Sequence, residues 1–233
     1  MKIKSYAGFV FAALLCIVAI GCQQIQAPTT SETAQGDQAV TIAKHSGSGL
    51  GRIIIANRAS GTLSEIDANT DEVIATHTVS NGGEPMYVVW SPALNRVYVG
   101  DRANNRVIAY DADDMSEIGS ATTGAGVFHM WADLRGDKQL WVNNDIDKTT
   151  SVVDPSTLQV LATVPTPADL VDLGGKPHDV IVEPRGRRAY VSVLGVDGAN
   201  DYVVAYSTDT FEEVGRAAVG QDPHLSLSPN NDH

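Results

Sequence analysis

Four similar sequence units follow one another along the chain, and this repeat restricts the fold more than any other feature. Each unit contains a short β-rich run, and the runs start at Ile53, Val97, Leu140 and Ala189. Successive starts are 44, 43 and 49 residues apart. A period of roughly 40 to 50 residues indicates stacked supersecondary units, as in propellers and solenoids. The chain is therefore expected to form a series of similar units.

Each unit contains four predicted strands. A second strand ends at an Asp or Ser that can cap the following turn, at Asp67, Asp111, Asp154 and Ser207. A third strand follows, and a Gly-rich segment leads to a fourth at 86–91, 129–134, 178–183 and 224–228. Four short strands joined by turns, with no helical period, predict an all-β fold, a β-propeller of four-stranded antiparallel blades. The four repeats cover about 52–95, 96–138, 139–187 and 188–233, and a solenoid fits them less well.

The second repeat carries a more specific resemblance. The series Arg96-Val97-Tyr98-Val99, Val107-Ile108-Ala109-Tyr110-Asp111 and Glu117-Ile118-Gly119 resembles the YVTN-type β-propeller repeat family, and the resemblance extends over 52–233. Members of this family usually have more than four blades. Three explanations therefore remain open: a small closed ring, a homodimer of two half-rings that completes the ring, or a truncated copy of a longer propeller.

The N-terminal segment is typical of an exported lipoprotein. Lys2 and Lys4 precede a stretch without charge from Tyr6 to Gly21, which is the pattern of a secretory signal. Ala19-Ile20-Gly21-Cys22 resembles the bacterial lipobox, so residues 1–21 are expected to form a signal peptide and Cys22 to carry the lipid. Residues 22–51 then form the lipidated cysteine and a flexible tether. Gln23 after the cysteine resembles the pattern sent to the outer membrane, so we expect an anchor at its periplasmic face or at the cell surface.

Charge and cysteine content exclude several classes of partner and site. The chain has 16 Lys and Arg against 28 Asp and Glu, a net charge of -12, and such a surface repels nucleic acid. The two cysteines, Cys16 and Cys22, both precede the repeats. The repeats therefore contain neither a disulfide framework nor a thiolate metal cluster.

Three histidines and a methionine recur where each third strand leads into the innermost strand of the next blade. The motifs are Gly83-Glu84-Pro85-Met86, Gly126-Val127-Phe128-His129, Lys176-Pro177-His178 and Asp222-Pro223-His224. In a propeller these positions converge near one mouth of the central channel, where imidazole and thioether suit copper. The alternative is a purely structural role, in which Pro fixes the turn and His satisfies backbone groups. Copper-containing nitrous oxide reductase and the haem-binding propeller of nitrite reductase resemble this family, which implies copper or haem under the metal-binding hypothesis.

The loops on the same face predict a binding surface. Arg58 and Arg102 occupy matching positions, where a guanidinium can hold an anionic ligand. The sequence shows no nucleophile elbow, zinc-protease helix or phosphate-binding loop. It therefore favours a lipid-anchored module that binds a protein or small molecule at this loop face over an enzyme, and the alternative is a metal- or haem-binding redox propeller.

Overall fold

The computed structural model describes residues 51–133, 136 and 138–224. The predicted signal peptide, Cys22 and the tether lie outside the described residues, as does the segment 225–233. Within the described ranges, no helix is both long and apolar enough to cross a lipid bilayer.

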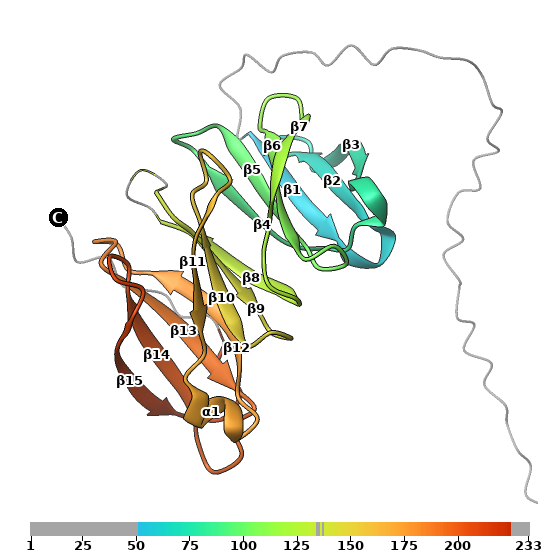
Figure 1. Ribbon diagram of the computed structural model, residues 1–233. Helices are drawn as coiled ribbons and strands as arrows, with labels where there is room; N and C mark the ends of the chain where they lie inside the picture. The colour runs from blue at the N-terminus through green and yellow to red at the C-terminus, as the bar shows by residue number, and fades with distance from the viewer. Residues whose placement is uncertain (1–50, 134–135, 137, 225–233) are drawn as a thin grey trace, which may run out of the picture. The chain divides into compact units, whose positions relative to one another are not determined.

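Fifteen strands form four antiparallel sheets (Figure 1). The first sheet contains β1 (Arg52–Asn57), β2 (Thr62–Asp67) and β3 (Glu72–Thr78). The second contains β4 (Pro85–Ser91), β5 (Arg96–Asp101), β6 (Arg106–Asp111) and β7 (Glu117–Thr122). The third contains β8 (Val127–Ala132), β9 (Leu140–Asn144), β10 (Thr149–Val153) and β11 (Val160–Pro165). The fourth contains β12 (Lys176–Val182), β13 (Arg188–Leu194), β14 (Asp201–Ser207) and β15 (Glu213–Val219).

The prediction of a β-propeller with four-stranded blades is confirmed. Each sheet is a simple meander, and the first strands of consecutive sheets contact each other in the order β1–β4, β4–β8 and β8–β12. Each of the first three repeats supplies three strands to one sheet and the first strand of the next, and the first sheet has three strands within the described residues. Over these residues the contacts between inner strands run from β1 to β12, and the four sheets do not close into a ring.

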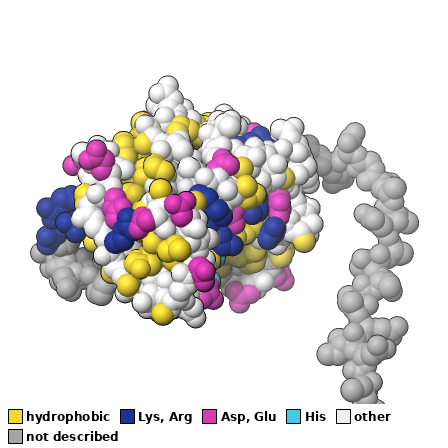
Figure 2. Space-filling model, turned by 60° about the horizontal axis from the view of Figure 1, so that its bottom comes forward, with side chains coloured by type: hydrophobic (Ala, Val, Ile, Leu, Met, Phe, Trp, Pro, Cys, Tyr) yellow, Lys and Arg dark blue, Asp and Glu magenta, His cyan; other side chains and the backbone are white. Residues whose placement is uncertain are grey.

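The hydrophobic core lies between neighbouring sheets. Three clusters of buried side chains fill the three spaces, and the largest fully buried residues are Trp141, Tyr98, Leu63 and Ile108. Central strands β5, β6, β9 and β10 are almost entirely buried because sheets cover both of their faces. On the face shown in Figure 2, basic, acidic and hydrophobic side chains are interspersed.

The turn between the second and third strand of each repeat has the structure that its Asp or Ser predicts. The Asp67, Asp111 and Asp154 carboxylates each accept a hydrogen bond from the backbone N–H two residues later, at 2.7 to 2.8 Å. Ser207 does the same through its hydroxyl at 3.2 Å. The residue four positions after each has a positive φ: Asp71, Met115, Leu158 and Phe211. A local side-chain acceptor therefore defines the same turn four times.

The connection before β12 differs from the prediction of a body without helices. The short helix α1 (Ala168–Asp172) lies between β11 and β12, and it buries Leu170 in the core between the third and fourth sheets. Pro167 precedes its first residue, where a fixed φ favours helix initiation. A single turn of helix gives no periodic pattern in the sequence, so only the longer spacing of 49 residues indicated an insertion here.

Asp101 at the end of β5 is expected to be the acidic group that matters most for stability. Its carboxylate is fully buried and accepts hydrogen bonds from the Glu84 N–H, Asn104 Nδ2 and Arg106 Nε, at 2.8 to 2.9 Å. Burial raises the pKa of Asp101, but these donors more than offset it, so that its pKa lies below the ordinary value. Asp101→Asn removes the buried charge that pairs with Arg106 Nε, while the hydrogen bonds of Arg106 to Ser80 remain. We expect a loss of about 2–4 kcal/mol of unfolding free energy at pH 7.

Urea denaturation at pH 7 and pH 3 would measure this loss. A carboxylate with a lowered folded pKa stabilises the protein above its unfolded pKa, and this contribution disappears as the pH falls through the folded pKa. The difference between the wild type and Asp101→Asn should therefore shrink below about pH 4. Asp209→Asn, at an exposed turn residue, is the control and should change stability by less than about 0.5 kcal/mol. Equal stabilities at pH 7 for wild type and Asp101→Asn would contradict the assignment.

Candidate metal centre

Irregularities in the innermost strands bring the predicted histidines together. The pairing of β4 with β5, β8 with β9 and β12 with β13 shifts register near the start of each inner strand, as in a β-bulge. A bulge interrupts the alternation of side chains between the two faces. As a result, two consecutive residues of β12 turn toward each other, and His178 Nδ1 lies 3.2 Å from Asp179 Oδ1.

The register corrects the expected equivalence of the histidine positions. Val127, Pro85 and Pro177 occupy corresponding places opposite the end of the second strand. Counting from them, Phe128 corresponds to Met86 and His178, while His129 corresponds to Tyr87 and Asp179. The motif that leads into the third sheet, Gly126-Val127-Phe128-His129, has no proline. If this motif is aligned with the others by its histidine, its residues are displaced by one position. In the described part of the chain, His129 and His178 therefore do not occupy equivalent positions of their inner strands. His129 lies one residue further along its strand than His178 does.

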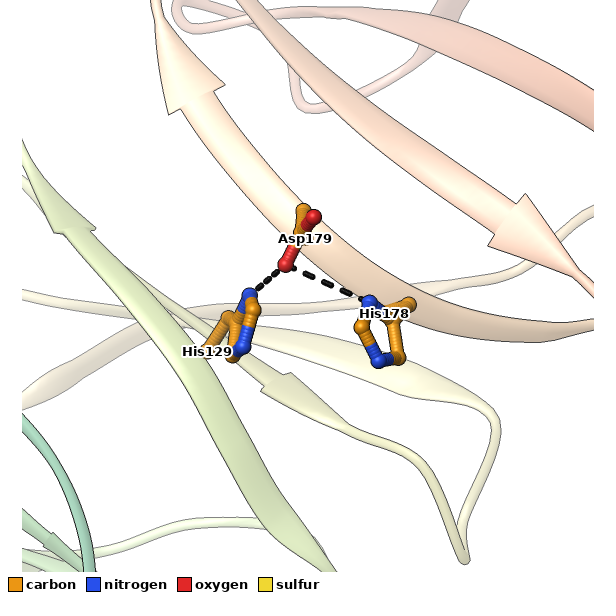
Figure 3. A group of neighbouring side chains, drawn as sticks. All are labelled: His129, His178 and Asp179. Atoms are coloured by element: carbon orange, nitrogen blue, oxygen red, sulfur yellow. Dashed lines mark ion pairs between the residues drawn. The ribbon is translucent and has the colours of Figure 1, made fainter. Parts of the chain in front are cut away.

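Three donor residues from two sheets form the centre of the site (Figure 3). His129 comes from β8, and His178 and Asp179 come from β12; one potential ligand atom of each lies within 4.8 Å of the others. His129 Nδ1 contacts Asp179 Oδ1 directly. Both imidazoles are 15% exposed and the carboxylate is 4% exposed. The cluster is therefore shielded from solvent on most sides while its imidazoles remain reachable.

His224 lies at the edge of this cluster. Its Nδ1 is 3.8 Å from Asp179 Oδ2, and its ring packs edge-on against His178 with centroids 4.9 Å apart. Its side chain is 62% exposed, and Nε2 lies 3.5 Å from the Asp222 carboxylate. His224 therefore reaches the cluster from the solvent side and can act as an additional ligand or as a cover.

Aromatic rings surround the donors. Tyr87 lies 4.1 Å from the His129 ring, and Phe128 lies 4.7 Å from both His129 and His178, measured between centroids. The Arg102 guanidinium stands 5.9 Å from the centre of the Phe128 ring. The same guanidinium pairs with the Asp145 carboxylate at 2.9 Å. These contacts hold the Phe128 ring, and through it the two imidazoles, in a defined orientation.

The two predicted ligand-face arginines are occupied by partners within the protein. Arg58 forms an ion pair with Glu84, and Arg102 with Asp145. Arg58 is 56% exposed, whereas Arg102 is 19% exposed. Neither guanidinium group is therefore fully available to an anionic ligand. Arg102 instead packs against the Phe128 ring beside the histidine cluster. Met86 occupies the strand position that corresponds to Phe128 and His178. The next residue, Tyr87, supplies the ring that contacts His129.

Asp179 is the functional candidate that the sequence analysis missed. An Asp that follows a His in a strand is expected on the opposite face, and only the bulge in β12 brings it to the cluster. The carboxylate oxygens of Asp179 and the Nδ1 atoms of His129 and His178 are buried and make no well-aligned hydrogen bond within the described residues. Buried polar atoms usually have a partner, so this group has the chemistry of an unfilled donor set.

Burial keeps the imidazoles in the form that binds metals. Desolvation, reinforced by the nearby His178 and His224, lowers the pKa of His129 to about 4. Desolvation and the proximity of His224 also lower the pKa of His178. Both rings are therefore neutral at pH 7, and neutral imidazole is the metal-binding form.

Acid is expected to destabilise the metal-free protein through His129. A histidine with a folded pKa of about 4 and an unfolded pKa near 6.5 binds more protons when unfolded, so stability falls as the pH drops from about 6.5 to 4. Replacing His129 with Gln should flatten this part of the profile by roughly 2 kcal/mol. Urea denaturation between pH 7 and pH 4.5, with EDTA present, measures the effect. Parallel profiles for wild type and His129→Gln would contradict it.

Comparison with known proteins supports the fold and leaves the activity open. No family model and no curated protein matches the sequence. Kuenenia stuttgartiensis hydrazine synthase is similar in structure, with a TM-score of 0.63 at 17% identity, over 73% of this chain and 46% of that one. The dihydro-heme d1 dehydrogenase NirN in complex with DHE is also similar, with a TM-score of 0.57 at 16% identity, over 77% of this chain and 38% of that one. The chain thus spans less than half of either protein, and both likenesses identify its fold as a β-propeller.

Proposed function

We propose that this chain is a ligand-binding β-propeller module of the cell envelope, and that His129, His178 and Asp179 bind a transition-metal ion. The carrying observation is the gathering of two partly buried, neutral imidazoles and one buried carboxylate, with ligand atoms within 4.8 Å of one another. Two rigid sheets supply the donors, so little conformational entropy is lost when an ion binds. His224 is positioned to complete the coordination from the solvent side.

The donor set favours zinc or iron(II). Two histidines and one carboxylate occur in catalytic zinc sites and in non-haem iron(II) sites. Under the metal-binding alternative, Met86 indicated copper because it offers a soft thioether ligand, but Asp179 supplies a hard oxygen beside His129 and His178. A hard oxygen ligand moves the preference away from copper(I).

A haem-type cofactor is the second candidate. Tyr87 and Phe128 present aromatic rings beside the histidines, and a planar macrocycle can stack on such surfaces. One of the structurally similar proteins is a dihydro-heme d1 dehydrogenase. In this second candidate, His129 or His178 would bind the haem iron, and the rings of Tyr87 and Phe128 would pack against the macrocycle.

The lipobox-like segment supports placing this module in the envelope. Lipidation of Cys22 would hold the propeller on the tether of residues 22–51 at the periplasmic face of the outer membrane or at the cell surface. The loop face would then be accessible to a protein or small-molecule partner. Labelling of cells with radioactive palmitate tests the anchor. The wild-type protein should incorporate the label, and Cys22→Ala should abolish this incorporation.

Metal analysis of the protein, purified without a polyhistidine tag, tests the proposed site. After treatment with EDTA, titration with cobalt(II) as a spectroscopic substitute for zinc should give visible absorption bands that saturate at one equivalent. Addition of haemin to the same protein should give a Soret shift only if the second candidate holds. Absence of stoichiometric uptake of zinc, iron(II), copper and haemin would overturn the proposal.

A further inference from the structure

The first sheet has an open edge. In the other three sheets, the strands β5, β9 and β13 each pair with an inner strand, β4, β8 or β12. The strand β1 occupies the same place in the first repeat, but within the described residues β2 is its only partner in the sheet. A strand edge of this kind is a template for the addition of another strand.

The pairing of the equivalent strands shows which backbone groups of β1 face this edge. The Gly51 carbonyl accepts from the Ala68 N–H at 3.0 Å on the β2 side. Backbone groups alternate between the two sides of a strand, so those of Arg52, Ile54 and Ala56 point to the open edge. In the fourth sheet the carbonyl of Arg188, which corresponds to Arg52, accepts from the Glu183 N–H just after the inner strand, at 3.0 Å.

An apolar groove runs beside the open edge. It has a volume of about 460 Å³ and is lined by Arg52 and Ile54 of β1, Val88 and Trp90 of β4, Val97 of β5, and Gly51, Asn95, Ala112 and Asp113 of neighbouring segments. Trp90 is 61% exposed. A large apolar side chain at this exposure is a liability that an added strand with an apolar residue beside it would remove.

The sequence contains a segment whose pattern of side chains suits this edge. Pro223-His224 corresponds to Pro177-His178, so residues 225–228 correspond to 179–182 of the inner strand β12. These four residues are Leu-Ser-Leu-Ser, an alternation with the period of a strand. Transferring the pairing of β12 with β13 places Ser226 opposite Ile55 and Leu227 opposite Ile54. Leu227 would then enter the groove beside Val88 and Trp90.

Residues 221 and 222, which precede this segment, make contacts that indicate where the segment can bind. These contacts favour pairing of the segment with β1 of a second copy of the chain. Gln221 donates to the Gly198 carbonyl at 3.1 Å and the Asp222 N–H to Asp201 at 2.7 Å, which fixes residues 221–222 at the fourth sheet. The strand β1 lies three sheet-to-sheet steps away, in a series that does not close. Four extended residues advance only about 13 Å, so they cannot pass over three sheets in the same chain.

We propose that residues 225–228 of one copy pair with β1 of a second copy, and that the reverse exchange occurs at the other end of the pair. The result is a twofold-symmetric dimer in which every sheet has four strands. The interaction is a β-strand addition, in which backbone hydrogen bonds supply affinity and Leu227 in its groove supplies specificity.

Disulfide trapping between two copies tests the exchange. Ile55 and Ser226 would form a non-hydrogen-bonded pair, in which the Cβ atoms are close enough for a disulfide. One full chain carries Ile55→Cys and another carries Ser226→Cys, both with Cys16→Ser and Cys22→Ser so that no other thiol remains. The two are mixed in detergent and oxidised mildly. We expect a disulfide-linked heterodimer to form in high yield.

The control replaces Ile55→Cys with Val73→Cys, an exposed position on β3 at the far edge of the same sheet. This pair should give at least tenfold less cross-linked product. A chain that carries both Ile55→Cys and Ser226→Cys and closes only on itself would overturn the proposal in favour of a ring within one chain. Equal yields for the test and control pairs would also overturn it. Neither outcome bears on metal binding, which the His129, His178 and Asp179 variants test separately.

Discussion

Replacement of His178 with Ala is expected to weaken zinc binding by about 100-fold or more. His178 supplies one of the two partly buried imidazoles, and its Nδ1 lies 3.2 Å from Asp179 Oδ1. Removing a direct ligand should cost at least as much as removing a residue that merely orients a ligand, which typically costs 10- to 100-fold in affinity. Titration of the EDTA-treated protein against a fluorescent zinc chelator measures the affinity.

Variants elsewhere in the chain distinguish a specific site from general zinc binding by histidine. His77→Ala removes a histidine that pairs with Glu65 at 3.0 Å, away from the cluster, and should leave zinc affinity unchanged. Asp179→Asn retains the size of the side chain and removes its charge, so it should weaken binding nearly as much as His178→Ala. Similar zinc affinities for wild type, His77→Ala and His178→Ala would contradict the proposed site.

Replacement of Trp141 with Ala is expected to cost about 3–5 kcal/mol of unfolding free energy. Trp141 is fully buried in the core between the third and fourth sheets, and its ring lies 6.1 Å from that of Phe211. Its Nε1 donates to Gln139 Oε1 at 3.0 Å. The substitution removes a large apolar surface and leaves a cavity between two sheets that are each held by their own hydrogen bonds. The space therefore cannot collapse easily.

Urea denaturation followed by circular dichroism measures the effect. Ile146→Ala is the control, since Ile146 is apolar but 61% exposed, and it should cost less than about 0.5 kcal/mol. A loss of under 1 kcal/mol for Trp141→Ala would show that the third and fourth sheets do not pack as described.

Most of the fold could be predicted from the sequence because the same pattern of strands and turns occurs in four repeats. The recurring Asp67, Asp111 and Asp154 define one turn through a local side-chain acceptor, and such local chemistry is visible in sequence. The short β-rich runs predict the strands, and the period of the repeat predicts the blade. The helix turn at α1 was missed because one turn has no period.

The candidate site could be predicted only in part. The recurrence of histidines before the inner strands identified His129, His178 and His224, and the structure brings all three near Asp179. The participation of Asp179 follows from the bulge in the pairing of β12 with β13. The one-residue offset of His129 becomes visible only when the pairing of β8 with β9 fixes the register. A bulge depends on tertiary packing between two strands, so the sequence of one strand does not reveal it.

X-ray absorption spectroscopy of the zinc-loaded protein tests the central claim most directly. The account predicts one bound zinc with at least two imidazole ligands and oxygen donors near 2.0–2.2 Å, and a reduced imidazole signal in His178→Ala. A spectrum with oxygen ligands alone, or one unchanged in His178→Ala, would contradict the assignment of His129, His178 and Asp179 as the metal centre.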